Sequence, residues 1–332
     1  MMATRQVAES RRVLTDCTAN VQRTVAGRIF LHSRTTLRLI SRIFSALFLA
    51  AAISCASFPP AGAAKPLHIL ITNDDGWDAP GIRALVEACR DLGEVIVAAP
   101  ARNHSGAGHS MTFDGPIAVR RSDKEGVAWF VIDARPATCV RLAVQSLLTT
   151  RPDLVVSGIN RGANLGTERY YSGTLGCAQD AALLGLPAMA VSLERAEDMD
   201  YQMAAMFTVS LVRELSRRGC LRPGLLLNIN VPARPAAEVK GFRLTRSDPR
   251  LAIEFYEKRT DERGEEAYWP GFRPLDPGPP GTDTWALSEG YISVTPLGLD
   301  QDDGRAAAAL RFIEGLAAGR SASPGLPLRP GG

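Results

Sequence analysis

Residues 70–76 read Leu70-Ile71-Thr72-Asn73-Asp74-Asp75-Gly76, an apolar strand that runs into two adjacent carboxylates and a glycine. Open α/β folds bind their ligands at the carboxyl edge of the sheet, where this strand ends. Two neighbouring carboxylates repel each other, so one stays protonated unless a cation lies between them. We therefore expect a divalent metal ion held by hard oxygen ligands at this position.

The segments around this stretch alternate between strand and helix. Leu67–Thr72 and Val95–Ala99 are apolar runs of strand length, and Gly81–Leu92 between them has helical spacing. A β-α-β order implies parallel strands joined by a right-handed crossover. A short buried strand at Leu154–Ser157 continues the pattern, which persists to about residue 232. The sequence therefore predicts an α/β fold with a doubly wound, mostly parallel sheet and flanking helices.

Residues 232–296 have a different character, with charged, aromatic and Pro/Gly-rich pieces that predict hairpins and long excursions. Segments of this kind serve oligomer interfaces, which is the role we expect here. We place the functional domain at residues 65–316, with a helix over Gly304–Leu316 and a flexible tail over 317–332.

Residues 1–64 lie outside the predicted fold and resemble a cleavable signal segment. Eight Arg and two acidic residues give them a charge of +6, and the apolar run Ile43–Ile53 precedes a small-residue site at Ala61-x-Ala63. The run is too short to cross a bilayer, so we expect no stable membrane anchor. If this segment directs export, the protein is periplasmic or secreted; if it does not, the protein is cytoplasmic.

Charge excludes one class of partner. The whole chain carries +3, so subtracting +6 leaves −3 on residues 65–332. A mildly acidic body is unsuited to binding polymeric nucleic acid.

Three oxygen-rich loops follow predicted parallel strands: Asp74-Asp75, Asn103-His104-Ser105-Gly106, and the loop from Asn160 to Asn164. Loops at the carboxyl ends of such strands converge at one edge of the sheet. Carboxylate, hydroxyl and amide oxygens suit Mg²⁺, Mn²⁺ or Ca²⁺ and leave coordination positions for water or a phosphate oxygen. The bland alternative is that each loop is only a turn.

A fourth loop, Tyr171-Ser172-Gly173-Thr174, opens a predicted helix. Free backbone N–H groups at a helix N-terminus bind anions, although Ser172 could simply cap the helix. A metal beside an anion site indicates phosphoryl chemistry. His104 and His109 are the candidate proton donors, and we select His109 as catalytic together with Asp74 and Asp75.

Several motifs together make the chain resemble the SurE family of survival-protein nucleotidases. The motifs occur in family order from about residue 67 to residue 300: Asn73-Asp-Asp-Gly76, Asn103-His-Ser-Gly106, Val155-Val-Ser-Gly-Ile-Asn160-Arg-Gly-Ala-Asn164, Tyr171-Ser-Gly-Thr174, Asn228-Ile-Asn-Val-Pro232 and Gly290-Tyr-Ile-Ser-Val-Thr-Pro296. The resemblance implies a Rossmann-like core, a C-terminal part exchanged between subunits of a homodimer or homotetramer, and hydrolysis of nucleoside 5′- and often 3′-monophosphates by metal-activated water.

The resemblance also implies roles for single residues. One divalent ion (Mg, Mn or Ca) per subunit would be held by Asp74, Asp75, Ser105 and Asn160. The phosphate would lie among Asn164, Ser172, Gly173 and Thr174. The chain departs from the family pattern at Ala134-Arg135-Pro136, where relatives have Gly-Thr-Pro, and at Asp180-Ala181, where they have Glu-Gly. These positions bear on substrate preference.

Three alternatives remain open at this point. A haloacid-dehalogenase-type phosphatase would need a second Asp two positions after the nucleophile, where this chain has Gly76. A non-catalytic nucleotide-binding or sensing module and a broad-specificity acid phosphatase are the others. A dinucleotide-dependent dehydrogenase is disfavoured because no Gly-x-Gly-x-x-Gly follows the first strand.

Overall fold

The computed structural model describes residues 66–251, 253–273, 276–311 and 313. One compact unit ends at Leu297, and a second begins at Gly298 and contains helix α8 (Gly304–Ala309). The predicted signal segment (1–64) and tail (317–332) lie outside the described residues, as does the end of the helix expected to reach Leu316. Among the described residues, every helix is too short or too polar to cross a membrane.

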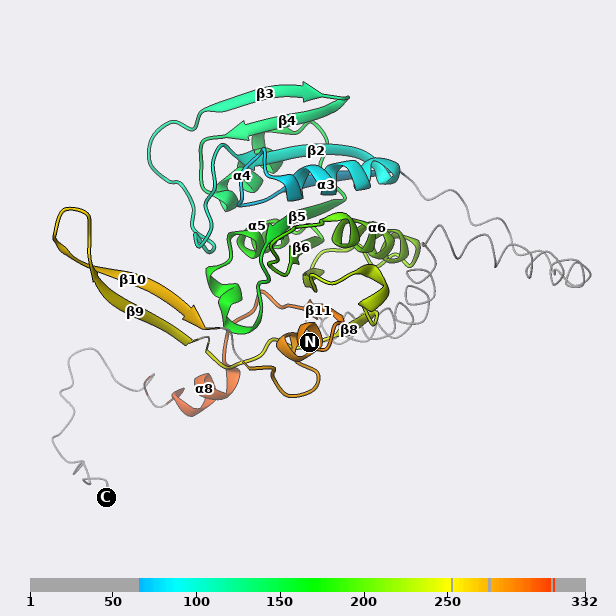
Figure 1. The fold of residues 1–332 in the computed structure, drawn as a ribbon. Coiled ribbons are helices and arrows are strands. Elements are labelled where there is room, and N and C mark those ends of the chain that lie inside the picture. The colour runs from blue at the N-terminus through cyan, green and yellow to red at the C-terminus, as the bar shows by residue number, and fades with distance from the viewer. Residues whose placement is uncertain (1–65, 252, 274–275, 312, 314–332) are drawn as a thin grey trace, which may run out of the picture. The chain divides into compact units, whose positions relative to one another are not determined.

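A nine-stranded sheet forms the centre of the first unit, in the order β3-β4-β2-β1-β5-β6-β7-β11-β8 (Figure 1). Its strands are β1 (Leu67–Thr72), β2 (Gly93–Pro100), β3 (Val119–Lys124), β4 (Val127–Ile132), β5 (Leu154–Arg161), β6 (Ala188–Leu193), β7 (Leu226–Val231), β8 (Phe242–Leu244) and β11 (Ile292–Pro296). Only the β3–β4 and β7–β11 pairs are antiparallel. The prediction of a mostly parallel α/β sheet is confirmed.

The strand order places a switch point between β1 and β5. From β1 the chain adds β2 and β4 on one side, and then returns to pair β5 with the other side of β1. Loops leaving two such strands diverge to opposite faces and open a crevice at their carboxyl ends. The turn after Thr72 lies there beside the last part of β5, since Thr72 and Ser157 are register partners.

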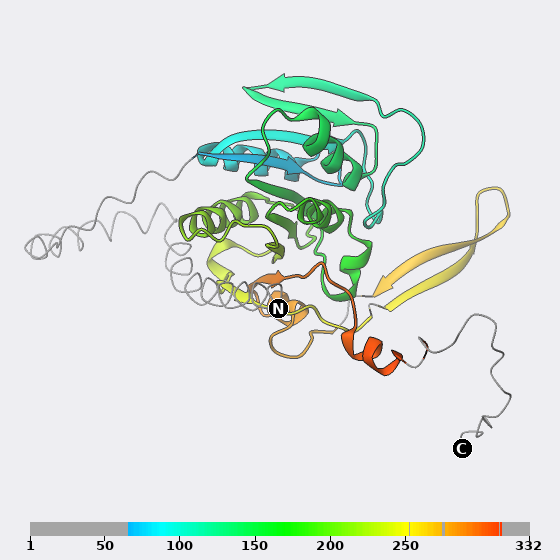
Figure 2. The same ribbon diagram turned by 180° about the vertical axis from the view of Figure 1, so that it is seen from behind.

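Helices cover both faces of the sheet, as the two opposite views show (Figures 1 and 2). They are α3 (Pro80–Cys89), α4 (Pro136–Leu142), α5 (Gly173–Leu183) and α6 (Gln202–Arg217), with the short α7 (Asp283–Ser288) near β11. Ile69 and Ile71 share the apolar core with residues of α3 and α6, whereas Thr72 faces Cys177 of α5. Because alternate strand residues face opposite sides, α3 and α6 lie across the sheet from α5.

Helix α3 packs closely against the sheet. Pro80 occupies a position that suits the first turn of a helix, and the predicted apolar face is buried. A Cβ on Gly81 would lie 1.9 Å from the carbonyl oxygen of Ile159, so only glycine lets this helix approach β5. The helix ends at Cys89 and a short 3₁₀ turn follows to Leu92, where the sequence predicted continuous helix.

Strand β5 runs four residues beyond the predicted end at Ser157. The pairing with β6 shifts by one residue between Ser157 and Asn160, which is a β-bulge. Gly158 makes this possible: its φ is +139°, and a Cβ there would lie 2.3 Å from the oxygen of Val191. Asn160 therefore lies on a strand, not on a loop as predicted.

Residues 232–296 are only partly the predicted hairpins. Strands β9 (Ile253–Thr260) and β10 (Glu266–Arg273) form an antiparallel two-stranded sheet of their own. In contrast, β8 joins the main sheet parallel to β11, and α7 is a helix that the sequence reasoning missed. The Pro- and Gly-rich composition obscured this short helix, although Thr282 caps its first turn by accepting a hydrogen bond from the amide of Trp285.

Candidate active site

The turn after β1 fixes the two adjacent carboxylates at the switch point. The side chain of Asn73 closes the turn: its Nδ2 donates to the oxygen of Gly76 at 2.8 Å, and its Oδ1 accepts from the Gly76 amide. Gly76 has a φ of +107°, which a side chain would strain. The turn is therefore rigid, and it presents Asp74 and Asp75 at the end of the central strand.

Asp74 is a buried carboxylate, only 3% exposed. Burial raises its pKa to about 6, the negative charge of Asp75 adds to the rise, and a hydrogen bond from Thr174 opposes it. That bond joins Thr174 Oγ1 to Asp74 Oδ1 at 2.5 Å. A carboxyl group in this state is poised to exchange its proton for a cation.

Asp75 is half-buried, and burial raises its pKa too. Several groups oppose the rise: the amide of Arg161, which donates to Asp75 Oδ2 at 3.1 Å, the charges of Arg161 and Arg195, and a hydrogen bond from the side chain of Ser105. The structure thus brings Ser105, from the loop after β2, to Asp75, from the loop after β1.

The loop that carries Ser105 is held at the carboxylates by its own backbone. The amide of His104 donates to the carbonyl oxygen of Asp74 at 2.8 Å, and Asn103 Oδ1 accepts from the amide of Ser105 at 2.6 Å. His104 has a lowered pKa, chiefly because burial and the nearby charges of Arg135 and Arg102 disfavour its protonated form.

Asn160 lies on β5 beside Arg161, the residue whose amide binds Asp75. Its Nδ2 donates to the oxygen of Gly162 at 2.8 Å. Because this bond uses an amide hydrogen, the Asn160 oxygen keeps its lone pairs for a cation.

These groups fit a hard divalent cation by their chemistry. Two carboxylates with raised pKa, a hydroxyl and an amide form a donor set made only of oxygen, as Mg²⁺, Mn²⁺ and Ca²⁺ prefer. Within the described ranges no group of three or more His, Cys, Asp or Glu residues could hold a metal ion, so a site here depends on the hydroxyl and amide oxygens as well as the two carboxylates.

The N-terminus of α5 lies directly against Asp74. A Cβ on Gly173 would fall 2.7 Å from the Cβ and from Oδ2 of Asp74. Ser172 is the N-cap, and its Oγ accepts from the amide of Leu175 at 3.0 Å, so the capping alternative describes its hydroxyl correctly. With the hydroxyl of Thr174 bound to Asp74, the anion-binding capacity here resides in the backbone N–H groups of the first turn.

Asn164 anchors the turn after β5 to the neighbouring strands. Its side-chain Nδ2 donates to Ser192 Oγ at 2.8 Å. Its backbone amide donates to Asn230 Oδ1 at 2.7 Å, and its backbone carbonyl oxygen accepts from the side chain of Asn228 at 2.8 Å. The side chain that we predicted at the phosphate is thus committed to β6.

His109 lies on the far side of its loop from Ser105. Its Nε2 is 3.4 Å from Oδ1 of Asp180, which also accepts from Arg141 at 2.7 Å. Burial raises the pKa of Asp180, but the bonds from His109 and Arg141 outweigh it and leave the pKa lowered. The sequence connected Asp180 only with substrate preference; the signal for this contact was a single carboxylate within a helix of mostly small and apolar residues.

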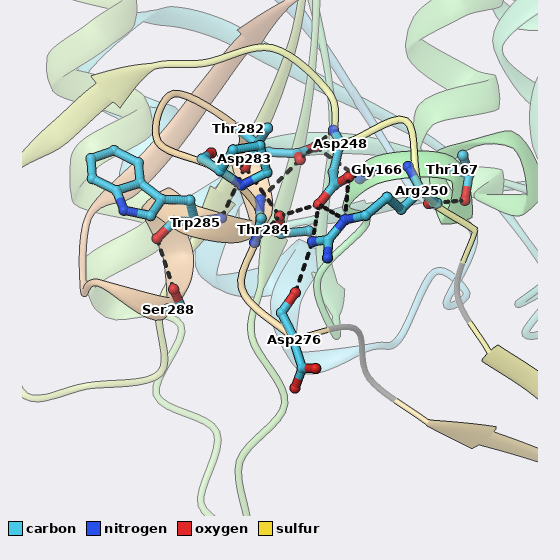
Figure 3. A network of polar contacts seen from close by, with 12 residues as sticks. Gly166, Thr167, Asp248, Arg250, Asp276, Thr282, Asp283, Thr284, Trp285 and Ser288 are labelled. Carbon is cyan, nitrogen blue, oxygen red and sulfur yellow. Dashed lines mark hydrogen bonds and ion pairs between the residues drawn. The ribbon is translucent and has the colours of Figure 1, made fainter.

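A second set of residues that the sequence reasoning missed secures the segment before α5 (Figure 3). Asp283 Oδ2 accepts from the amide of Gly166 at 2.8 Å, and its Oδ1 accepts from the amides of Asp248 and Thr284, both at 2.9 Å. Arg250 pairs with Asp248 and holds the pKa of that carboxyl well below its usual range. Burial raises the pKa of Asp283. The two carboxylates thereby tie residues 166–171 to the base of the β9–β10 hairpin.

The chain is similar in sequence to known proteins. The family model "Survival protein SurE" matches residues 69–253. The chain is 44% identical over 240 residues to "5'-nucleotidase SurE" of Geobacter metallireducens, covering 70% of this chain and 92% of that protein. It is 46% identical over 236 residues to "5'/3'-nucleotidase SurE" of Cronobacter sakazakii, covering 70% and 91%.

A solved structure agrees with both. The crystal structure of the SurE protein from Aquifex aeolicus superimposes with a TM-score of 0.66 at 38% identity, covering 74% of this chain and 99% of that one. The family resemblance inferred from the motifs is confirmed, and the chain belongs to the SurE family of survival proteins.

Proposed function

We propose that this protein is a 5′-nucleotidase that hydrolyses nucleoside 5′-monophosphates, and also 3′-monophosphates, to nucleoside and phosphate. The observation that carries the proposal is the meeting of Asp74, Asp75 and Ser105 with the N-terminus of α5 at the switch point of the sheet. The printed names of the relatives, 5′-nucleotidase and 5′/3′-nucleotidase, support the same activity.

In this proposal Asp74, Asp75, Ser105 and Asn160 hold one divalent ion, with Mg, Mn and Ca as candidates. When bound, such an ion polarises a phosphoryl oxygen and lowers the pKa of water so that it can attack phosphorus. Thr174 contributes by fixing the rotamer of Asp74 through the 2.5 Å hydrogen bond, and the amide of Arg161 does the same for Asp75.

The phosphate group is proposed to lie at the first turn of α5, an eleven-residue helix. The amides of Gly173 and Thr174 are the donors there, and Ser172 caps the turn that presents them. Asn164, in the turn after β5, completes the proposed phosphate site. An N-terminus of this kind attracts the negative charge that the phosphoryl oxygens carry. His109 completes the proposed set as proton donor to the leaving oxygen, through Nδ1, since Nε2 faces Asp180.

Phosphate release tests this function directly. The purified chain is screened against AMP and other nucleoside monophosphates with Mn²⁺, Mg²⁺, Ca²⁺ and Zn²⁺, with and without chelator. We expect release that scales with enzyme concentration and stops with the chelator. Binding of AMP without release would favour the nucleotide-sensing module, and equal rates on non-nucleotide phosphomonoesters would favour a broad-specificity phosphatase.

The hairpin β9–β10 is the proposed oligomerisation element, giving a homodimer or homotetramer. Its two strands pair only with each other among the described strands, and an isolated two-stranded hairpin is marginally stable in water. Tyr256 and Tyr268 are 67% and 58% exposed, which is unfavourable for aromatic side chains unless another chain covers them.

Export is proposed from Ile43–Ile53 and the Ala61-x-Ala63 site, giving a periplasmic or secreted enzyme that meets extracytoplasmic nucleotides. N-terminal sequencing of the native protein tests it. An intact residue 40 would contradict cleavage and favour the cytoplasm.

A further inference from the structure

Asp180 is a buried carboxylate whose bonding is incomplete. Its side chain is fully enclosed, and both Arg141 and His109 approach the same oxygen, Oδ1. The other oxygen, Oδ2, is buried and has no hydrogen-bond partner among the described residues, and the same holds for Nε of Arg141. Arginine–carboxylate pairs are frequently bidentate, with two parallel bonds, and that arrangement would satisfy both atoms.

An unsatisfied buried polar atom destabilises a fold by about 1–3 kcal/mol, so its retention calls for an explanation. Here Arg141 makes a single bond to Asp180, and His109 approaches the same oxygen, Oδ1. His109, in turn, belongs to the loop after β2, which packs on helix α5.

Helix α5 aligns three contacts along one face, because Gly173, Gly176 and Asp180 are spaced by three and four residues. Gly173 lies against Asp74. A Cβ on Gly176 would lie 2.6 Å from the oxygen of Gly108 and 3.0 Å from Cα of His109, so the loop after β2 lies directly on the helix. Asp180 then binds the ring of the same His109.

That loop is the one that delivers Ser105 to Asp75. It is fixed at one end by the bond from the His104 amide to the Asp74 oxygen. At the other end it is fixed by the bond from the Gly108 amide to the Tyr171 oxygen, at 2.9 Å, and by the contact between His109 and Asp180. Only three residues lie between Ser105 and His109, so a shift at His109 displaces Ser105.

We propose that Asp180 is a positioning residue, which acts through His109 to hold Ser105 at the distance from Asp75 that divalent-metal binding requires. The inference rests on the proposed metal-dependent function and adds to it a residue about two helical turns from Gly173, the residue that packs against Asp74. Arg141 keeps Asp180 oriented toward the loop. Residues that orient metal ligands typically change metal affinity or activity by about 10- to 100-fold when they are mutated.

The test compares Asp180→Asn, Asp180→Glu and His109→Gln with a matched control, Glu214→Gln. Glu214 is also buried and also pairs with arginines, Arg217 and Arg218, but it lies on α6, across the sheet. Each variant is measured for thermal unfolding, for Mn²⁺ binding to the metal-free protein by calorimetry, and for kcat and KM with AMP.

We expect Asp180→Asn and His109→Gln each to weaken Mn²⁺ binding about tenfold or more. At saturating Mn²⁺ we expect kcat to fall and KM to stay near the parent value, because the α5 amides that bind the phosphate are untouched. The double variant binds Mn²⁺ no more weakly than either single variant, since both act through one contact. Asp180→Glu retains Mn²⁺ binding, because it keeps the carboxylate. Glu214→Gln lowers the unfolding temperature but leaves Mn²⁺ binding and kcat unchanged.

Parent-like Mn²⁺ binding and kcat in Asp180→Asn would overturn the inference and make Asp180 a structural residue. If Asp180→Asn does not fold, His109→Gln provides the test, because the His109 side chain is partly exposed and its substitution disturbs the fold less. Unchanged Mn²⁺ affinity in His109→Gln would also overturn the inference. An inactive parent that still binds Mn²⁺ would refute the nucleotidase function and leave this inference measurable by calorimetry. A parent that binds no Mn²⁺ would refute both.

Discussion

Gly173 and Asp74 are packed so closely that a Cβ on the glycine would lie 2.7 Å from the carboxylate oxygen Oδ2. Real Cβ atoms essentially never approach another heavy atom within 3.0 Å, so any side chain at position 173 displaces either the helix or the carboxylate. The first turn of α5 and the end of β1 are thus a single rigid element of the site.

This contact predicts the effect of Gly173→Ala. We expect a loss of about 1–3 kcal/mol in unfolding free energy from overpacking, and a fall of about 100-fold in kcat/KM, because a displacement near 1 Å suffices for that. Gly298→Ala is the control, since a Cβ there meets nothing within 4 Å. Urea unfolding and phosphate release measure the two effects; parent-like kinetics in Gly173→Ala would show that the site tolerates movement of Asp74.

Asp75→Asn separates metal binding from folding. The substitution keeps the shape of the side chain and removes the charge, so we expect turnover to fall below detection and the thermal stabilisation by Mn²⁺ to disappear. Asp78→Asn, an exposed carboxylate three residues further along, is expected to behave like the parent. Differential scanning fluorimetry with and without Mn²⁺ reports the binding; full activity in Asp75→Asn would exclude this site.

The raised pKa of Asp74 predicts a pH dependence with a definite sign. Its pKa is about 6 in the folded, metal-free protein and 3.8 for an exposed aspartate, as in the unfolded chain, so the folded state binds more protons between these values. Stability therefore falls as pH rises from about 4 to 6, and the full loss persists above 6. Asp74→Asn lacks this penalty. In chelator at pH 7.5 we expect it to be more stable than the parent by up to about 3 kcal/mol.

That difference is expected to shrink as the pH falls toward 4, because the carboxyl is then protonated in the folded chain and about half protonated in the unfolded chain. Urea denaturation of both proteins at pH 4.5, 6 and 7.5 provides the comparison. A constant difference across this range would show that the Asp74 pKa is not raised. At pH 7.5 saturating Mn²⁺ is expected to make the parent more stable than Asp74→Asn, because the ion stabilises only the parent.

Asp283→Asn tests the network in Figure 3. The three backbone amides of Gly166, Asp248 and Thr284 need two acceptor oxygens, and asparagine offers only one. We expect a loss of about 1–3 kcal/mol in stability together with reduced kcat, since Gly166 begins the segment that leads to Ser172. Asp276→Asn, whose side chain is exposed, is the control. A stability loss with unchanged kcat would confine the network to a structural role.

The hairpin prediction concerns assembly. Tyr256 and Tyr268 lie on the same face of β9–β10, because Tyr268 pairs with Lys258, two residues from Tyr256. We expect the double substitution Tyr256→Glu and Tyr268→Glu to lower the molar mass measured by light scattering during size exclusion. Met206→Glu, at an exposed position of α6, is expected to leave it unchanged. A parent that is monomeric at micromolar concentration would contradict the proposal.

The sequence predicted most of what short-range pattern controls. The first strand begins at Leu67 and ends at Thr72, as predicted. The apolar face of α3 is buried, as the spacing of its apolar residues indicated. The β-α-β opening then implied the parallel sheet, and the sheet implied that Asp74 and Ser105 would lie near each other. Each of these steps follows from periodicity and crossover handedness, which local sequence encodes.

What escaped prediction depends on contacts distant in sequence. The continuation of β5 through Asn160 needs pairing with β6 across a bulge that Gly158 permits. The partner of His109 is Asp180, 71 residues away, and the partner of Gly166 is Asp283, 117 residues away. Nothing in the spacing of single residues specifies such pairs, because they arise only when the sheet has ordered the segments.

The three contacts along α5 also constrain how the chain can change in length. Each residue added to a helix rotates everything beyond it by about 100°. A one-residue insertion between Gly173 and Asp180 would turn the buried carboxylate away from His109 while leaving Gly173 against Asp74. Insertions and deletions between Gly173 and Asp180 are therefore expected to separate these contacts, whichever residue is added or removed.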